Sequence, residues 1–193
     1  MIPTELGLLS QMTVLSLAAN ALEGALPTEL GLLSSLILLS LHDNKFMGSI
    51  PSELGLLTNM NVTLNLKNNQ LTSTIPTELG ILTHLGELEL GGNHLTGQIP
   101  SELGQFTSIG TLTFANNSLL GTVPQELSSL WQTLHTLKLE GNELLSGIIP
   151  EALCNLNGTC VSQVLDWCEN NNGLSVDCTN LLCGCDCPCD NGS

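Results

Sequence analysis

The spacing of the Ile/Leu/Val-Pro steps constrains this chain more than any other feature of its sequence. The prolines of these steps follow one another at intervals of 24, 24, 25, 24, 24 and 26 residues, at Pro3, Pro27, Pro51, Pro76, Pro100, Pro124 and Pro150. Between them the same order of Leu, Asn, Gly and Pro recurs. A fixed period of roughly 20 to 29 residues predicts a solenoid in which each repeat supplies one strand and one return segment.

Each repeat contains a short segment in which apolar and polar residues alternate. In residues 86–90 this pattern turns Leu88 and Leu90 toward a core and Glu87 and Glu89 toward solvent. The other repeats place equivalent inward pairs at Leu15/Leu17, Leu39/Leu41, Leu64/Leu66, Leu112/Phe114 and Leu137/Leu139. Stacked about 4.8 Å apart, such strands form one parallel sheet along the inner, concave side of the solenoid.

An Asn stands three residues after the second inward residue of each repeat, at Asn20, Asn44, Asn69, Asn93, Asn117 and Asn142. The chain turns out of the sheet there and leaves backbone groups without ladder partners. A side-chain amide both donates and accepts, so a ladder of Asn satisfies these groups from repeat to repeat. We interpret these residues as structural.

A Gly-x-Ile-Pro step closes most repeats, as in Gly48-Ser-Ile-Pro51 and Gly97-Gln-Ile-Pro100, with Ser73 replacing Gly once. Gly permits a tight bend, and Pro opens a short helical turn without losing a hydrogen bond. With these residues, positions 2–153 resemble the plant-type leucine-rich repeat, whose unit is Leu-x-x-Leu-x-x-Leu-x-Leu-x-x-Asn-x-Leu-x-Gly-x-Ile-Pro. The resemblance implies a right-handed α/β horseshoe with a parallel concave sheet and short 3-10 or helical return segments. It also implies recognition proteins of the cell surface or exterior, such as receptor ectodomains and inhibitors of wall-degrading enzymes.

The net charge of the chain limits the classes of molecule that it is expected to bind. With three Lys, no Arg, eighteen acidic residues and a net charge of -15, the chain is predicted to bind neither nucleic acid nor an anionic membrane surface. A protein, peptide or glycan ligand without strong negative charge is favoured. A Glu lies two residues after most prolines, at Glu5, Glu29, Glu53, Glu78, Glu102 and Glu126. We interpret this column as complementing the first turn of each return segment and not as a calcium site, and we expect no metal and no cofactor.

All eight Cys lie after the repeats, at Cys154, Cys160, Cys168, Cys178, Cys183, Cys185, Cys187 and Cys189. We therefore divide the chain into a solenoid, residues 1–153, and a Cys-rich C-terminal cap, residues 154–193. Disulfides that close the solenoid are favoured, with open connectivity and a local Cys154–Cys160 pair as one candidate. The crowded Cys-x-Cys tail is similar to the ends of diatom leucine-rich repeat proteins, and a thiolate cluster binding zinc or copper(I) is the alternative.

Two further features favour a location outside the cell. Glycosylation sequons begin at Asn61, Asn116 and Asn157, which fits a secreted or cell-surface protein. The sequence starts in the back half of a repeat, at Ile2-Pro3, so we expect a signal sequence and further repeats upstream, with a membrane anchor possible in the parent protein. This start is expected to leave Leu6, Leu9, Leu15 and Leu17 without a covering neighbour.

The candidate ligand-binding residues point outward from the predicted concave sheet: Ile37, Leu38, His42, Asn65, Lys67, Glu87, Glu89, Thr113, His135 and Lys138. We predict a non-enzymatic recognition module, because the four His share no repeat position and no nucleophile has a partner base. A structural wall or matrix protein is the alternative. Binding to ice or mineral is a third hypothesis, based on a hydroxyl column at Thr4, Thr28, Ser52, Thr77 and Ser101.

Overall fold

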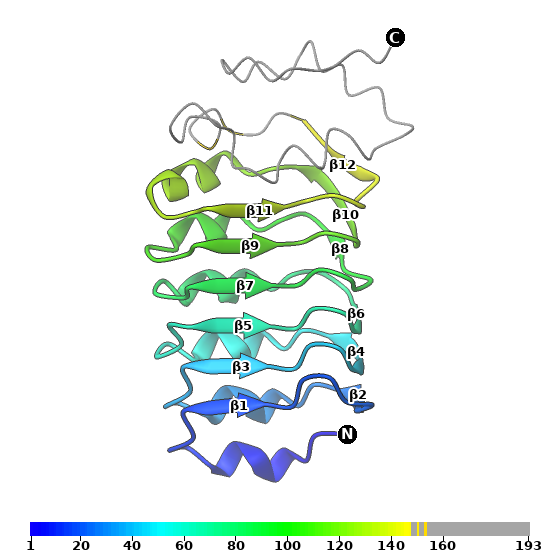
Figure 1. Ribbon diagram of the computed structural model, residues 1–193, viewed down its shortest axis with the longest axis vertical. Coiled ribbons are helices and arrows are strands. Elements are labelled where there is room, and N and C mark those ends of the chain that lie inside the picture. Colours follow the sequence, from blue (N-terminus) through cyan, green and yellow to red (C-terminus); the bar gives the residue numbers. More distant parts are fainter. Residues whose placement is uncertain (148–149, 151–152, 154–193) are drawn as a thin grey trace.

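The computed structural model describes residues 1–147, 150 and 153. These residues wind into a stack of similar coils (Figure 1), each with a strand on one side and a 3-10 turn on the other. The strands form a six-stranded parallel sheet in the order β1-β3-β5-β7-β9-β11. Their bounds are β1 (Val14–Ser16), β3 (Leu38–Ser40), β5 (Thr63–Asn65), β7 (Glu87–Glu89), β9 (Thr111–Thr113) and β11 (Thr136–Lys138). The leucine-rich repeat solenoid predicted from the sequence is confirmed.

The register of this sheet matches the repeat alignment of the sequence. Leu15 pairs with Leu39, Leu39 with Leu64, and Leu64 with Leu88, and the inward columns continue through Leu112 and Leu137. The extra residue of repeat three falls before β5 and leaves the register intact. Equivalent residues of successive repeats therefore stand side by side, which allows whole columns of the surface to be read from the sequence.

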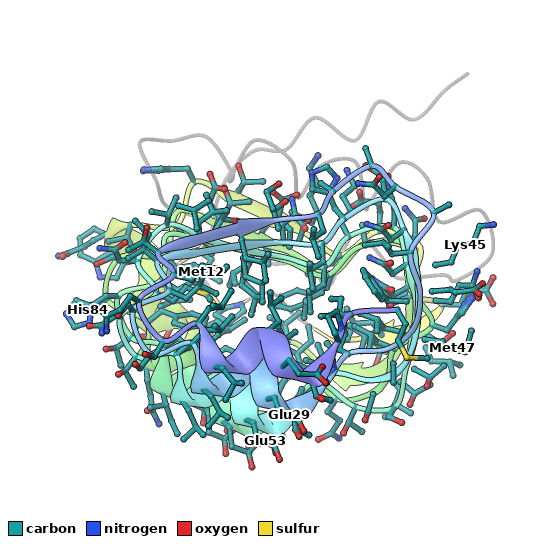
Figure 2. The ribbon with its side chains drawn as sticks, turned by 90° about the horizontal axis from the view of Figure 1, so that it is seen from below. Met12, Glu29, Lys45, Met47, Glu53 and His84 are labelled. Carbon is teal, nitrogen blue, oxygen red and sulfur yellow. The ribbon has the colours of Figure 1, made fainter. Side chains whose placement is uncertain are left out.

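The return segments are 3-10 turns on the side of the core opposite the sheet (Figure 2). They are η1 (Thr4–Leu8), η2 (Thr28–Leu32), η3 (Ser52–Leu56), η4 (Thr77–Ile81), η5 (Ser101–Gln105) and the longer η6 (Gln125–Gln132). A Pro stands at the N-cap of each turn. The pyrrolidine ring fixes its φ, at -71° in Pro27 and -59° in Pro124, and a ψ of 139° and 135° keeps both residues extended just before the turn begins. A Glu lies in the first turn of each, as predicted.

Short strands on the lateral side of the coils were not expected from the sequence. They form two three-stranded parallel sheets, β2-β4-β6 and β8-β10-β12. Their bounds are β2 (Glu23–Ala25), β4 (Lys45–Ser49), β6 (Gln70–Thr72), β8 (Thr96–Gly97), β10 (Ser118–Thr122) and β12 (Leu144–Ser146). The two sheets meet at Ser73, which has a φ of +67° where Gly48 has +80°, and a lone bridge between Thr74 and Thr96 joins them.

The core is a column of Leu, Ile and Phe layers between sheet and turns. Phe46, Phe114 and the inward Leu residues of repeats two to five are fully buried. The expectation for the first repeat was partly wrong: Leu9 is 49% exposed and Leu6 and Leu17 are half-buried, but Leu15 is only 7% exposed. Leu15 is buried because it belongs to the apolar core of the stack and has Leu39 of the next repeat as its register partner.

The Asn side chains bridge adjacent repeats. Asn44 Nδ2 donates to the carbonyl oxygens of Leu17 (2.9 Å) and Leu41 (3.1 Å), and Asn44 Oδ1 accepts from the backbone N–H of Leu22 (3.0 Å). Asn69, Asn93, Asn117 and Asn142 have the same type of partners one repeat further on. Asn20 is exposed and bonds only to carbonyls of its own repeat. The ladder therefore satisfies the backbone where each strand ends.

Candidate functional site

The concave face, defined here as the outward surface of the six-stranded sheet, consists of three columns. The first column contains Val14, Leu38, Thr63, Glu87, Thr111 and Thr136, and the second contains Ser16, Ser40, Asn65, Glu89, Thr113 and Lys138. Backbone hydrogen bonds continue the ladder past the strands, so a third column follows with Ala18, His42, Lys67, Gly91, Ala115 and Glu140. Each column changes chemical character from repeat to repeat.

Most of the residues proposed from the sequence reach solvent on this face. Lys67, Glu87 and His135 are exposed, and Ile37, Leu38, His42, Asn65, Glu89 and Lys138 are half-buried. Thr113 differs, since it is only 7% exposed and its Oγ1 has no hydrogen-bond partner. Its register neighbours Glu89 and Lys138 have longer side chains that flank the short Thr. Thr113 therefore offers a ligand little surface, contrary to the expectation.

Three polar side chains join at the ends of β3 and β5. His42 Nδ1 lies 2.7 Å from Asp43 Oδ2, and Asn68 Nδ2 donates to Asp43 Oδ1 at 2.8 Å. The hydrogen bond from Asn68, followed by that from His42, lowers the pKa of the Asp43 carboxyl below its ordinary value, and the charges of His42 and Lys67 act in the same direction. Because an ionised carboxylate can only accept, the Nδ1 of His42 carries the proton in this contact. The result is a fixed negative charge at the rim of the concave face.

Asp43 and Asn68 are not among the binding residues predicted from the sequence, although a signal was present. Both occupy the repeat position after the third column, with φ of +55° and +54°. Asp, Asn and Gly tolerate this left-handed conformation better than other residues. The equivalent positions hold Gly92, Asn116 and Gly141, and in the first repeat Ala19, with a φ of +53°. Aligning the repeats at this position would have placed Asp43 directly beside Asn68.

The character of the concave face changes along the stack. An apolar area spans the first three repeats, where Val14 is 51% and Val62 is 42% exposed beside Ile37 and Leu38. Repeats four and five combine Glu87 and Glu89 with small residues, namely Gly86, Gly91, Gly92, Gly110 and Ala115. Lys138 and His135 follow in repeat six. Such a surface offers apolar, acidic and basic contacts in a fixed order over a long, shallow face.

Aromatic residues are scarce on this face in the described part of the chain. Phe46, Phe106 and Phe114 are buried in the core, and Trp131, 47% exposed, belongs to η6 on the turn side. Sugar rings are commonly held by stacking on aromatic faces, and protein interfaces rely on aromatic anchors. The described concave face lacks such platforms.

The turn side carries the hydroxyl column that motivated the surface-binding hypothesis. Each hydroxyl donates to the carboxylate beside it: Thr28 Oγ1 to Glu29 Oε2 at 3.3 Å, Ser52 Oγ to Glu53 at 3.3 Å and Thr77 Oγ1 to Glu78 at 3.3 Å. The array is therefore a row of hydroxyl–carboxylate pairs. This pairing gives no support to ice or mineral binding, which needs free hydroxyls on an uncharged plane.

Two shallow hollows adjoin each other on the lateral side and share Thr74, Ile75 and Thr77. Both are lined by the Ile-Pro steps and by hydroxyl and Glu side chains, and neither opens onto the concave face. Within residues 1–147, no group of His, Cys, Asp or Glu has an arrangement that could hold a metal ion. In the same part of the chain, no helix is long and apolar enough to cross a membrane.

Several predictions from the sequence are not tested by the structure, and some concern residues outside its described part. Asn61 and Asn116 of the first two sequons are exposed, Asn61 before β5 and Asn116 after β9. The Cys-rich cap, residues 154–193, lies outside the described residues, and so do Asn157 and all of the Cys: Cys154, Cys160, Cys168, Cys178, Cys183, Cys185, Cys187 and Cys189. The domain boundary, the disulfides, the alternative thiolate metal cluster and the glycosylation sites stay predictions.

Known proteins share this architecture. The Leucine Rich Repeat family profile matches residues 35–57, 62–82, 84–106 and 133–156. The BIR2 ectodomain from Arabidopsis thaliana is 34% identical with a TM-score of 0.60, and the match covers 69% of this chain and 68% of that one. A comparison with curated protein sequences gives no significant match.

Two longer receptors match as well. The receptor chain of the PEPR1-AtPEP1 crystal structure is 37% identical with a TM-score of 0.74. The match covers 79% of the present chain and 21% of the receptor chain. The Arabidopsis receptor kinase HAESA ectodomain, in complex with an IDA peptide hormone ligand, is 36% identical with a TM-score of 0.74. This match covers 80% of the present chain and 25% of the HAESA chain. This chain thus spans about a fifth to a quarter of these receptor ectodomains. By its repeats and by these similarities, the chain belongs to the plant-type leucine-rich repeat proteins.

Proposed function

We propose that this chain is a non-enzymatic recognition module that binds a peptide or protein segment along its concave face, at the cell surface or outside the cell. The observation that carries the proposal is the contrast between variable and constant columns. The second concave column reads Ser, Ser, Asn, Glu, Thr, Lys, while the ladder position is always Asn and the turn position always Glu. A solenoid needs constant residues where repeats contact each other, so variation on one exposed face marks the surface available for a ligand.

The chemistry of the concave face supports an extended peptide. Val14, Ile37, Leu38 and Val62 offer apolar contacts at one end, and Glu87 and Glu89 offer acceptors in the middle. A peptide with an apolar segment followed by a basic segment complements this order. The similar ectodomains include structures in complex with peptide ligands, such as HAESA with an IDA peptide hormone. Glycans fit less well because the described concave face lacks aromatic platforms.

Charge reversal on the concave face tests the proposal. Peptides from the surrounding secreted fraction are captured on the full chain, and the captured set is then measured on Glu89→Lys and Lys67→Glu. We expect each reversal to weaken binding of at least one captured peptide by roughly tenfold, because a like charge then faces the ligand. Glu102→Lys, on η5 at the opposite side of the core, is the matched control and leaves that binding unchanged. If both concave variants bind every captured peptide as the parent chain does, the concave assignment is wrong.

A further inference from the structure

Repeats one to four present a row of exposed apolar side chains on the turn side of the solenoid. Leu8 is 78%, Leu32 55%, Leu56 60% and Ile81 52% exposed. They occupy the same position of η1 to η4, one after another along the stack. The corresponding residues of η5 and η6 are Gln105 and Ser129, both exposed. The fold therefore accepts polar residues at this position, and the apolar side chains have no role in the core that explains them.

A row of carboxylates runs beside the apolar row. In a 3-10 turn, side chains three residues apart eclipse each other, so Glu29 and Leu32 point the same way, as do Glu53 and Leu56 in the next repeat. Figure 2 shows Glu29 and Glu53 on the outward side of the turns, opposite the sheet. We call the surface formed by Glu29, Leu32, Glu53, Leu56, Glu78 and Ile81 the turn stripe. It is an apolar row and an acidic row about 6 Å apart along the turn axis, given a rise of roughly 2 Å per residue.

The acidic row of the turn stripe is not neutralised by this chain. All three Lys lie elsewhere: Lys45 in β4, Lys67 after β5 and Lys138 in β11. The adjacent hydroxyls of Thr28, Ser52 and Thr77 hold the carboxylates of Glu29, Glu53 and Glu78 in one repeated position. A second copy of this chain, with its net charge of -15, and an anionic membrane would both be repelled by such a row. A cationic partner is attracted to it.

The spacing of the turn stripe matches a helix. Neighbouring strands lie about 4.8 Å apart, and the turns stack tightly too, because a Cβ on Gly31 would lie only 2.3 Å from the carbonyl oxygen of Glu53. An α-helix laid along the stack brings one side chain per turn, every 5.4 Å or so, over each repeat. An extended strand presents same-face residues at about 6.6 Å and falls out of step. We propose that the turn stripe docks a cationic amphipathic helix, with its apolar side chains over Leu32, Leu56 and Ile81 and its Lys or Arg over the Glu row.

A synthetic helical peptide provides the test. The probe is about 18 residues long, enough to form a helix, with Leu at one position per turn, a flanking row of Lys, and Ala elsewhere. Its binding to the full chain is measured by fluorescence anisotropy at low and high salt. The proposal expects saturable binding that weakens with salt, and at least roughly tenfold weaker binding when the Lys are replaced by Glu or the Leu by Ser.

Variants of the chain locate the binding. The triple variant Leu32→Gln, Leu56→Gln, Ile81→Gln introduces the residue that stands naturally at Gln105, so it is expected to fold, with an unchanged thermal midpoint. It should lose binding by roughly tenfold or more, and Glu29→Gln, Glu53→Gln, Glu78→Gln should remove the salt dependence. Matched controls are Leu144→Gln, an exposed apolar residue of β12, and the concave pair Glu87→Gln, Glu89→Gln; both should bind the probe as the parent does.

Other outcomes overturn the docking proposal. Probe binding that survives both triple variants, or that falls equally in the controls, shows that the turn stripe is not the site. Sedimentation that shows self-association abolished by the Leu and Ile substitutions assigns the stripe to a second copy of the chain. Stripe-dependent binding to anionic vesicles assigns it to a membrane. Because the concave variants serve as controls here, failure of this proposal leaves the concave-face function standing, and the reverse also holds.

Discussion

The concave face and the turn face of this solenoid are built from the same repeats but tolerate different amounts of variation. On the concave face, the column from Ser16 to Lys138 includes hydroxyl, amide, acidic and basic side chains. On the turn face, Pro, Glu and a buried Leu recur, and Gly occupies the fourth position of η1 to η5. The difference follows from contact between repeats: the turns touch through their backbones, whereas the repeats join in the sheet through its backbone ladder and leave the type of the outward side chain free to vary.

The space around two glycines, one in a turn and one beside the sheet, illustrates this difference. A Cβ on Gly31 of η2 would approach the carbonyl oxygen of Glu53 to 2.3 Å, and the equivalent approach recurs for Gly55 and Gly80. A Cβ on Gly110, which precedes β9, meets nothing closer than 3.8 Å. Gly31 is therefore required by close backbone stacking, whereas Gly110 is not. The freedom is specific to Gly110, because a Cβ on Gly86, at the same position one repeat earlier, would lie 2.8 Å from the carbonyl oxygen of Val62.

The largest expected effect comes from breaking the Asn ladder between the two faces. Asn69→Ala leaves the buried backbone N–H of Phe46 without its acceptor. It also removes one of the two Asn donors from each of the carbonyl oxygens of Leu41 and Leu66, which keep their bonds from Asn44 and Asn93. We expect a loss of about 3 kcal/mol in the free energy of unfolding, measured by urea denaturation. Asn20→Ala, an exposed position, should cost less than about 1 kcal/mol. Equal losses at both positions would show that the ladder contributes no more than local bonds.

The next largest change in the free energy of unfolding is expected when Gly31 and Gly110 are each replaced by Ala. Gly31→Ala forces η2 and η3 apart, because the obstructing atom belongs to the backbone, and we expect a loss of about 2 kcal/mol. Gly110→Ala has room for its methyl group and should change the free energy of unfolding by less than about 0.5 kcal/mol. Chemical denaturation of the two variants side by side decides the matter. A tolerant Gly31 would mean that the turn face is as adaptable as the sheet.

A smaller effect of opposite sign is expected at Thr113. Its buried Oγ1 has no hydrogen-bond partner, so the nearly isosteric Thr113→Val should stabilise the chain by about 1 kcal/mol. Thr111→Val, at a half-buried position of the same strand, should be close to neutral. Binding of a concave-face peptide should be the same for Thr113→Val as for the parent. Weakened binding would return Thr113 to the ligand-contacting residues.

The smallest effect concerns acid stability at the rim of the concave face. The pKa of Asp43 is lowered by Asn68 and His42, so the ionised form is favoured in the folded chain. This stabilisation is complete above the ordinary pKa of Asp and is lost as the pH falls through the lowered value, roughly below pH 4. Because Asp43 is exposed, the contribution stays below about 0.5 kcal/mol.

Thermal midpoints between pH 2 and pH 6 test this acid effect. Asp43→Asn should lose slightly less stability than the parent chain as the medium is acidified. Asn68→Ala, which removes the leading hydrogen bond to the carboxylate, should behave in the same way. Parallel acid profiles for all three chains would show that the cluster contributes nothing to stability.

Features that depend on one repeat were predictable, and features that depend on contacts between repeats were less so. The alternation around Leu88 and Leu90 predicts the strand and its inward face from local sequence alone. The lateral sheets depend on the backbone path after each Asn, for which the sequence shows only a Gly or Ser. The burial of Thr113 depends on Glu89 and Lys138 in other repeats, and the cluster of Asp43 with Asn68 joins residues one repeat apart. Only a column-by-column alignment of repeats brings such neighbours together.

The break in the lateral ladder at Ser73 has a mechanical consequence. Along most of its length the solenoid is tied on two sides, by the main sheet and by a lateral sheet. Between β6 and β8 the pairing is reduced to the bridge from Thr74 to Thr96 and to two backbone hydrogen bonds, from the N–H of His94 to Leu71 and from the N–H of Thr96 to Ser73. Bending stiffness depends on ties placed away from the bending axis, so we expect this junction to be the most compliant in the described stack. Bending of the solenoid around a long ligand is then expected to concentrate at this junction, between the repeats with β2, β4 and β6 and those with β8, β10 and β12.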